Sequence, residues 1–284
     1  MNTSSTSSHT NQASSIDSVK LKQALLTRSR PKKANWFSNT MTFSWRALLK
    51  LKYIPEQLLD VTVFPIMFLL MFTYLFGGAI AGSTGDYLQF LLPGILVMTV
   101  ITITMYTGME LNNDISKGIF DRFRSLPIWR PSVLVGALFV DAVRYSIASL
   151  IMIGLGLILG FRPDGGTIGV ISAVGLLLLF SFSLSWIWTT LGLVLRSEKS
   201  LMGVSMMVLF PLTFISNVFV DPSTLPSWLQ AFVDINPVSL LVTAVRGLMH
   251  GVATTEQIGV VIIASLLLIL VFAPLTMFLY KNKN

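Results

Sequence analysis

The stretch NNDISKGIFDRFRSLPIWR, residues 112–130, is the longest polar interruption between two almost uncharged parts of the chain. It contains four basic residues and two acids. Its apolar residues recur at helical spacing: Ile115, Ile119, Phe120 and Phe123. This pattern predicts a short amphipathic helix that ends near Pro127. Because the flanking sequence is apolar, we expect this helix to lie at a membrane surface.

The composition of the chain excludes an ordinary soluble domain. Of its 284 residues, 53% are hydrophobic and only 12% are charged, and the mean hydropathy is +0.74. Soluble domains have about 25% charged residues. A helix needs about 20 residues to cross the hydrocarbon core, with a range of about 17 to 25. Six uncharged blocks meet this length, the third one only barely: Val61–Ala81, Tyr87–Met109, Tyr145–Phe161, Gly165–Leu195, Ser200–Val220 and Gln257–Tyr280.

These blocks predict an all-α integral membrane protein with six transmembrane helices. The expected spans are residues 58–80, 87–111, 133–160, 167–195, 200–220 and 258–280. Together they form one transmembrane domain, residues 58–284, in which 112–130 is the polar segment between the second and third spans.

The chain before the first span divides into two parts. Residues 1–34 are polar, with too few large apolar side chains for a core, and predict a disordered tail. Residues 35–57 predict an amphipathic helix parallel to the membrane, because Met41, Trp45 and Leu48 fall on one helical face.

Basic residues predict the orientation of the spans. With a cytoplasmic amino terminus, seventeen Lys and Arg residues lie inside and only Arg162 and Arg246 lie outside. This asymmetry follows the positive-inside rule and places both termini in the cytoplasm. The same rule accounts for the basic runs, so no nucleic-acid partner is expected.

Residues 221–256 form the main external segment and are not a plain loop. The dipeptide Asn236-Pro237 interrupts them, and the uncharged run Ile235–Val245 is too short to cross a bilayer. We expect a re-entrant or interfacial helical hairpin, with Arg246 at the outer head-group level.

Two charged residues of the third span, Asp141 and Arg144, are three positions apart and can pair on one helix face. Two interpretations remain open. The pair is a structural surface pair near the cytoplasmic end, or it ties the segment 112–130 to the third span so that movement of one moves the other.

The chain contains no motif for nucleotide hydrolysis or other catalysis. GxxxxGK[ST], HExxH and GxSxG are all absent, and there are two His residues and no Cys. We therefore expect no catalytic residue, no cofactor and no metal in this chain. Ionisable residues are scarce in the spans, which indicates that energy for transport enters through a cytoplasmic partner.

Seven segments together resemble a permease subunit of the ABC-2 superfamily of ATP-binding cassette exporters, in its daunorubicin-resistance branch. In chain order they are PEQLLD (55–60), FPIMFLLMFTYLFGGAI (64–80), YLQFLLPGILVMT (87–99), DISKGIFDRFRSLPI (114–128), PLTFISNVFV (211–220), LPSWLQAF (225–232) and NPVSLLVTAVRGL (236–248). The resemblance covers residues 55–280 and leaves out the amino-terminal tail.

The resemblance implies a connecting helix, six spans, an external hairpin and a coupling helix that contacts a separate ATPase. The coupling segment would comprise Gly118, Ile119, Phe120, Asp121, Arg122, Phe123, Arg124, Ser125, Leu126 and Pro127. Phe120 and Phe123 would enter a groove on the ATPase. Arg122 and Arg124 would be its charged contacts, unless these basic residues only anchor lipid head groups.

The implied assembly has two ATPase subunits, which bind ATP and Mg, and a second permease, as a homodimer. It would export an apolar or amphipathic drug, antibiotic or lipid across a bacterial cytoplasmic membrane. Two alternatives stay open: an ABC-2 exporter of polysaccharide or glycolipid, and a motor-free channel or membrane scaffold.

Overall fold

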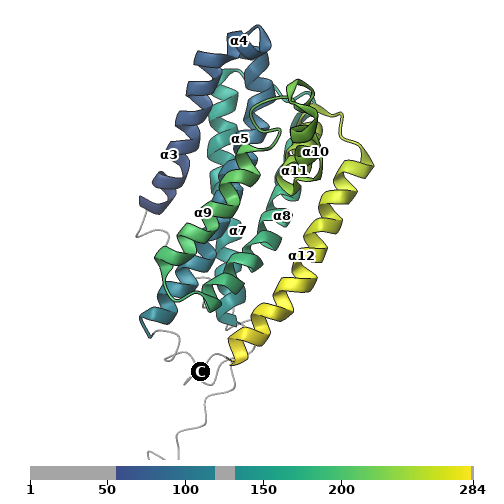
Figure 1. The fold of residues 1–284 in the computed structure, drawn as a ribbon. Coiled ribbons are helices and arrows are strands. Elements are labelled where there is room, and N and C mark those ends of the chain that lie inside the picture. The colour runs from purple at the N-terminus through teal and green to yellow at the C-terminus, as the bar shows by residue number, and fades with distance from the viewer. Residues whose placement is uncertain (1–55, 119–131, 283–284) are drawn as a thin grey trace, which may run out of the picture.

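The computed structural model describes residues 56–118 and 132–282, and this part of the chain is helical with no β-strand (Figure 1). The elements are α3 (Glu56–Met71), the π-helical turn η1 (Phe72–Phe76), α4 (Gly77–Ala81), α5 (Thr84–Ser116), α7 (Ser132–Leu159), α8 (Gly166–Val194), α9 (Glu198–Phe214), the 3-10 turn η2 (Pro222–Thr224), α10 (Ser227–Ile235), α11 (Pro237–His250) and α12 (Thr255–Asn282).

Five helical segments among the described residues are long and apolar enough to cross a membrane: 62–81, 84–116, 136–159, 166–194 and 255–282. The pair α10 and α11, bent by 76° at their junction, would be a sixth if the two helices form one broken span. The prediction of a helical, multi-pass membrane protein is therefore confirmed. The place of the hairpin relative to the membrane stays a prediction.

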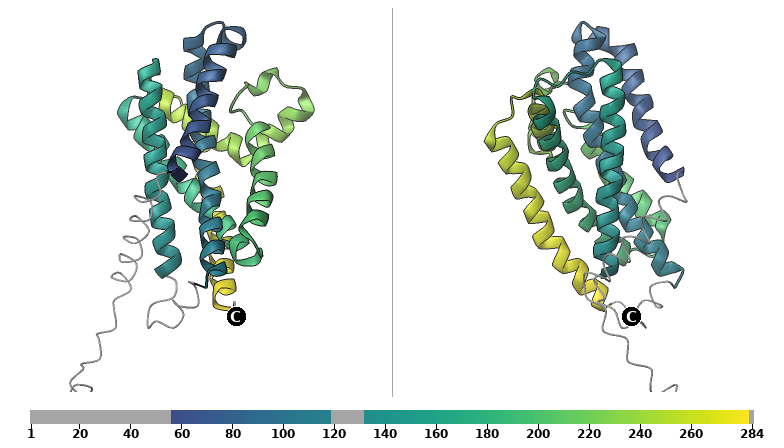
Figure 2. Two further views of the ribbon diagram at one scale, coloured as in Figure 1. Left: turned by 90° about the vertical axis from the view of Figure 1, so that its left-hand side faces the viewer. Right: turned by 180° about the vertical axis from the view of Figure 1, so that it is seen from behind.

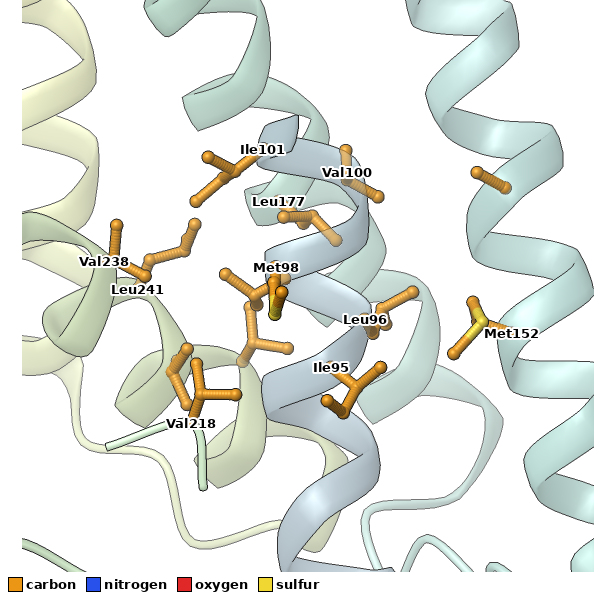
Figure 3. Close-up of a cluster of buried hydrophobic side chains, with 14 of the residues drawn as sticks. Ile95, Leu96, Met98, Val100, Ile101, Met152, Leu177, Val218, Val238 and Leu241 are labelled. Atoms are coloured by element: carbon orange, nitrogen blue, oxygen red, sulfur yellow. The ribbon is translucent and has the colours of Figure 1, made fainter. Parts of the chain in front are cut away.

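Helix α5 is the centre of the bundle. It packs against α3, α4, α7, α8, α9 and α11, and 83% of its most apolar stretch is buried, against 11% for α12. Figure 3 shows the core around α5, where Ile95 and Ile101 lie among side chains from α7, α8 and α11. Helices α3 and α12 lie at opposite outer edges (Figure 2).

The helices alternate in direction, which decides what each end of the bundle contains. Helices α3, α7 and α9 run toward one end, and α5, α8 and α12 run toward the other (Figures 1 and 2). The gap between α5 and α7 therefore lies at the same end as the α8–α9 connection and the end of α12. We call this the coupling end, and the end that holds α4, α10 and α11 the hairpin end.

Helix α9 ends at Phe214, whereas the expected fifth span continues to residue 220. Its last turn has a specific partner, because the side-chain nitrogen of Asn236 donates to the carbonyls of Leu212 (2.8 Å) and Ile215 (2.7 Å). The carbonyls that a helix end leaves unpaired are thus bonded from another element. The chain then continues in a buried, non-helical segment, Ser216–Phe219.

Several expectations lie outside the described residues. These are the tail at residues 1–34, the connecting helix up to residue 55, and the coupling residues Ile119–Pro127.

Candidate functional site

The structure describes the two helices from which the coupling segment leaves and to which it returns. Helix α5 ends at Ser116, and α7 begins at Ser132. Gly118 has a φ of +67° and an amide that donates to the carbonyl of Ile115 at 3.0 Å. This left-handed residue is a common way to end a helix and favours glycine.

An ionic bridge joins α5 and α7 near the coupling end. Arg144 of α7 donates from Nη2 to Oε1 of Glu110 on α5 at 2.9 Å, and its Nη1 lies 3.2 Å from Oδ1 of Asp141. The hydroxyl of Thr107 on α5 donates to Oδ2 of Asp141 at 2.6 Å. We call these four residues the α5–α7 bridge. The carboxylate of Glu110 on α5 thus binds Arg144 of α7, and the carboxylate of Asp141 on α7 binds Thr107 of α5.

The bridge lies between the helices, with Asp141 and Arg144 buried and the side chain of Glu110 26% exposed. Asp141 is 3% exposed and Arg144 6% exposed, so the pair does not lie on the surface as one interpretation of the sequence expected. Buried charges are tolerated when they are paired and hydrogen-bonded. Removing one partner of such a pair is strongly destabilising, by about 3–5 kcal/mol, because the other charge stays buried. The bridge therefore resists separation of α5 from α7.

Glu110 and Thr107 were not among the residues expected to contribute to this site. Glu110 ends the second uncharged block, and it is 34 residues away from Arg144 in sequence. Only the antiparallel pairing of α5 and α7 brings the two together. Thr107 differs from Thr99, Thr102 and Thr104, whose hydroxyls donate to carbonyls of their own helix.

The same part of α5 is in close backbone contact with α8. A Cβ on Gly108 would lie 2.2 Å from the carbonyl oxygen of Trp188, and one on Gly192 would lie 2.5 Å from that of Gly108. Neither position has room for a side chain. The Asn112 side-chain nitrogen adds hydrogen bonds to the carbonyls of Gly192 (3.0 Å) and Leu195 (2.7 Å).

A third connection links α7 to α8, so that the three helices are joined pairwise. The hydroxyls of Tyr145 on α7 and Ser185 on α8 are 2.7 Å apart and buried. The indole of Trp188 also donates to Thr104 of α5 at 2.8 Å. Each of the helices α5, α7 and α8 is therefore hydrogen-bonded to the other two.

These contacts hold α5, α7 and α8 together near the end of α5. The carboxylates of the bridge are engaged by Arg144 and Thr107. Among residues 56–118 and 132–282, no group of three or more His, Cys, Asp and Glu is placed to hold a metal ion.

The external-hairpin residues gather at the opposite end of α5. Asn236 begins α11, where its Oδ1 accepts from the amide of Val238 at 2.9 Å, and Pro237 occupies the first helical position. Both residue types favour a helix start. Asn236 lies at the α10–α11 bend. It is hydrogen-bonded both to the end of α9 and to the first turn of α11.

Arg246 connects α11 to the beginning of α5. Its Nε donates to the carbonyl of Phe90 at 3.0 Å and its Nη2 to that of Asn217 at 2.9 Å, and the guanidinium carbon lies 3.9 Å from the centre of the Phe90 ring. Twenty residues of helix α5 separate Phe90 from Glu110, which is about 30 Å at 1.5 Å per residue. The structure therefore does not bring Arg246 to the α5–α7 bridge.

Comparison with known proteins gives consistent matches. Residues 38–250 match the family model described as ABC-2 type transporter. The chain is 50% identical over 279 residues to the daunorubicin resistance ABC transporter permease protein of Streptomyces coeruleorubidus, covering 98% of this chain and 99% of the relative. It is 28% identical over 202 residues to a probable doxorubicin resistance ABC transporter permease protein of Mycobacterium tuberculosis, covering 70% of this chain and 73% of the relative.

Proposed function

Because this chain belongs to the ABC-2 type transporter family, we propose that it is the membrane-spanning subunit of an ATP-driven exporter whose ATPase is a separate protein. Two permeases, as a homodimer, and two ATPase subunits would form the complete exporter. ATP and Mg would be bound by the ATPase alone. The assembly would lie in a bacterial cytoplasmic membrane with both permease termini inside.

The α5–α7 bridge is the observation that carries the mechanical part of this proposal. It connects α5, the helix that precedes the coupling segment in the chain, to α7, the helix that follows it. An ATPase that displaced this segment would therefore displace α5 and α7 together. The close contact of Gly108 and Gly192 would pass the same displacement to α8.

The transport cycle follows from two global states that the ATPase biases. ATP binding would close the ATPase pair, move the coupling segments seated on it, and shift the permease between inward-facing and outward-facing states. Hydrolysis would reset the pair. Phe120 and Phe123 would supply the apolar contact with the ATPase, and Arg122 and Arg124 the charged contact.

The cargo is an apolar or amphipathic compound such as a drug, antibiotic or lipid. Apart from a few charged residues, which include Glu110, Asp141 and Arg144, the spans carry Phe, Met, Thr and Trp rather than ionisable groups, a composition that suits such molecules. The names of the two relatives, which refer to daunorubicin and doxorubicin resistance, support daunorubicin as the first compound to test.

The proposal is tested in two steps with the full-length chain. Affinity purification from mildly solubilised native membranes, followed by mass spectrometry, should recover a stoichiometric protein with a P-loop. The double variant Phe123→Ala and Arg124→Glu should lose this partner while its unfolding midpoint stays that of the wild type. Inside-out vesicles containing both proteins should accumulate daunorubicin only when ATP is supplied.

Lys281→Ala together with Met202→Ala is the matched control, because both residues are exposed and lie outside the coupling segment. It should keep the partner. Retention of the ATPase by the Phe123 and Arg124 double variant would contradict the assignment of the coupling residues. Recovery of no ATPase under any mild detergent would contradict the exporter and favour a channel or scaffold. ATP-dependent movement of a glycolipid but not of daunorubicin would overturn the cargo class.

A further inference from the structure

A pocket of about 400 Å³ is lined by residues of α11, of the connection that follows it and of the beginning of α12. These elements lie at the hairpin end of the bundle (Figure 1). It is lined by Thr243, Arg246, Gly247, His250, Val252 and Gln257. The α5–α7 bridge contributes nothing to it. The pocket combines one cationic side chain with polar and apolar neighbours, which is a lining that selects for a charged ligand with an apolar part.

The charge of Arg246 is not paired with a carboxylate. Its two hydrogen bonds go to backbone carbonyls, those of Phe90 and Asn217, and within the described residues no Asp or Glu lies within ion-pair distance of it. Its Nη1 nitrogen has no hydrogen-bond partner there either. Asp221 stabilises the charge only from a longer distance. A partly buried guanidinium held in this way favours an anion in the pocket it lines.

Gln257 provides a second donor. Its Oε1 accepts from the amide of Thr254 at 3.1 Å, while Oγ1 of Thr254 accepts from the amide of Gln257 at 3.3 Å. This reciprocal pair is a capping box at the start of α12. Because it uses only the oxygen of the amide, the Nε2 of Gln257 has no partner among the described residues and is held at the pocket.

His250 closes the side of the pocket toward α5 and α8. Pro93 has no N–H, so the carbonyl of Gln89 lacks its usual helical donor, and Nε2 of His250 lies 3.1 Å from that oxygen. A carbonyl can only accept, so Nε2 carries the hydrogen. The other ring nitrogen, Nδ1, lies 3.8 Å from the exposed carboxylate of Asp164. His250 is therefore fixed in place by α5 and by the loop before α8.

An apolar strip continues from the pocket along α12. Val260, Leu267 and Val271 follow Gln257 at helical spacing on the same side of α12, and they are 40%, 56% and 55% exposed. The strip begins at the polar pocket and runs along the exposed side of α12 in the direction of the coupling end. This is the arrangement that an amphipathic molecule with one anionic head and long apolar chains would cover.

We propose that this pocket binds the phosphate of an anionic phospholipid, with the acyl chains along α12. Arg246 and Gln257 donate to the phosphate oxygens, and Val252 and the strip contact the apolar part. Because Nε and Nη2 of Arg246 already donate to carbonyls, Nη1 is the nitrogen left to donate to a phosphate oxygen, and the positive charge of the guanidinium strengthens that bond. The site is separate from the coupling end, so the inference does not depend on the proposed export function.

Gln257→Glu is the decisive variant. Glutamate keeps the acceptor that caps α12 but replaces the free donor by a negative charge beside the phosphate. Binding of phosphatidylglycerol to the purified full-length protein in a nonionic detergent, measured by native mass spectrometry, should weaken by at least about tenfold, given the size of a like-charge interaction at contact distance. Diacylglycerol with the same acyl chains should bind far more weakly than phosphatidylglycerol to the wild type.

Thr255→Glu is the matched control, because it adds the same charge at the same end of α12, at an exposed residue that does not line the pocket. It should leave phosphatidylglycerol binding within about twofold of wild type, since an exposed charge is screened. Equal weakening by both variants, or equal binding of the two lipids, would overturn the site. Displacement of phosphatidylglycerol by millimolar inorganic phosphate would keep the anion site and overturn the role of the strip.

Discussion

Arg144 and Arg246 are two arginines that the same bundle buries in opposite ways. Arg144, at the coupling end, contacts the carboxylates of Glu110 and Asp141. Arg246, at the hairpin end, is bonded to two backbone carbonyls and lies over the ring of Phe90. An arginine whose charge is paired with carboxylates of the same chain has little attraction left for an anionic ligand. A charge supported only by carbonyl dipoles retains its attraction for an anion.

The two ends of helix α5 therefore have different properties. At its carboxyl end, α5 is joined to α7 and α8 by contacts that leave little freedom, which suits a part that transmits displacement. Near its amino end, α5 supports a pocket with unused hydrogen-bond donors. We expect substitutions at the coupling end to change folding and coupling, and substitutions at the pocket to change ligand binding.

Arg144→Met should have the largest effect on stability. It leaves the buried carboxylate of Asp141 and the partly exposed carboxylate of Glu110 without their cation, at a cost of about 3–5 kcal/mol in the free energy of unfolding. Combining it with Glu110→Gln and Asp141→Asn should recover much of this loss, because the uncompensated charge is removed. Unfolding in mixed micelles measures both. Arg196→Met, at an exposed position, is the control; a loss of stability as large as that of Arg144→Met would contradict the role of the bridge.

Gly108→Ala should rank second. Its methyl group would meet the carbonyl of Trp188 at 2.2 Å, which backbone movement must relieve. Overpacking of this kind costs about 1–3 kcal/mol. Gly175→Ala on α8 has no atom within 4 Å of the new methyl group and should be neutral or slightly stabilising. If the two variants unfold at the same denaturant concentration, α5 and α8 are not in the contact described.

Asn236→Ala should cost about 0.5–2 kcal/mol in the free energy of unfolding, the usual range for loss of a helix cap. Asn236→Asp separates the two functions of this side chain. It keeps the acceptor for the amide of Val238 but loses the donor to Leu212 and Ile215. We expect it to be as damaging as alanine, because its carboxylate would face two carbonyl oxygens. Full stability of the aspartate variant would mean that only the cap matters.

Loss of the hydrogen bonds to the Asp221 carboxylate should have the smallest effect on stability, and this effect should depend on pH. Hydrogen bonds from the hydroxyl and amide of Ser223 hold the pKa of its carboxyl below the ordinary value of 3.8. Because the pKa of Asp221 is lower in the folded state, its ionised carboxylate stabilises the fold at pH values above the unfolded-state pKa. This stabilisation is lost as the pH falls through the folded-state pKa. Ser223→Ala should narrow the difference in unfolding midpoint between pH 5 and pH 3.

Asp221→Asn tests whether this acid also affects ligand binding in the pocket. It removes the one acid that stabilises Arg246 from a distance, so phosphatidylglycerol affinity should rise, by less than about threefold because the separation is large and screened. A fall in affinity would show that Asp221 positions Arg246 rather than competing with the ligand. Asp234→Asn, on α10, is the control for the charge change alone.

The amino-acid sequence by itself determined the class of the protein, most of the approximate spans and the family, and the proposed coupling segment still rests on the sequence alone. These depend on local properties: the length of uncharged runs, helical spacing, and the order of short motifs. The bend at Asn236-Pro237 was also readable, because proline and asparagine act on the backbone beside them.

Only the tertiary structure decided which polar groups meet. Arg144 could be paired with Asp141 from sequence because the two are three positions apart, but its bond to Glu110 depends on how α5 and α7 face each other. The contact of Gly108 with Gly192, the bond of His250 to the carbonyl exposed by Pro93, and the pocket at Arg246 arise in the same way. Each joins residues far apart in the chain, and composition and periodicity contain no information on which faces of two helices come together.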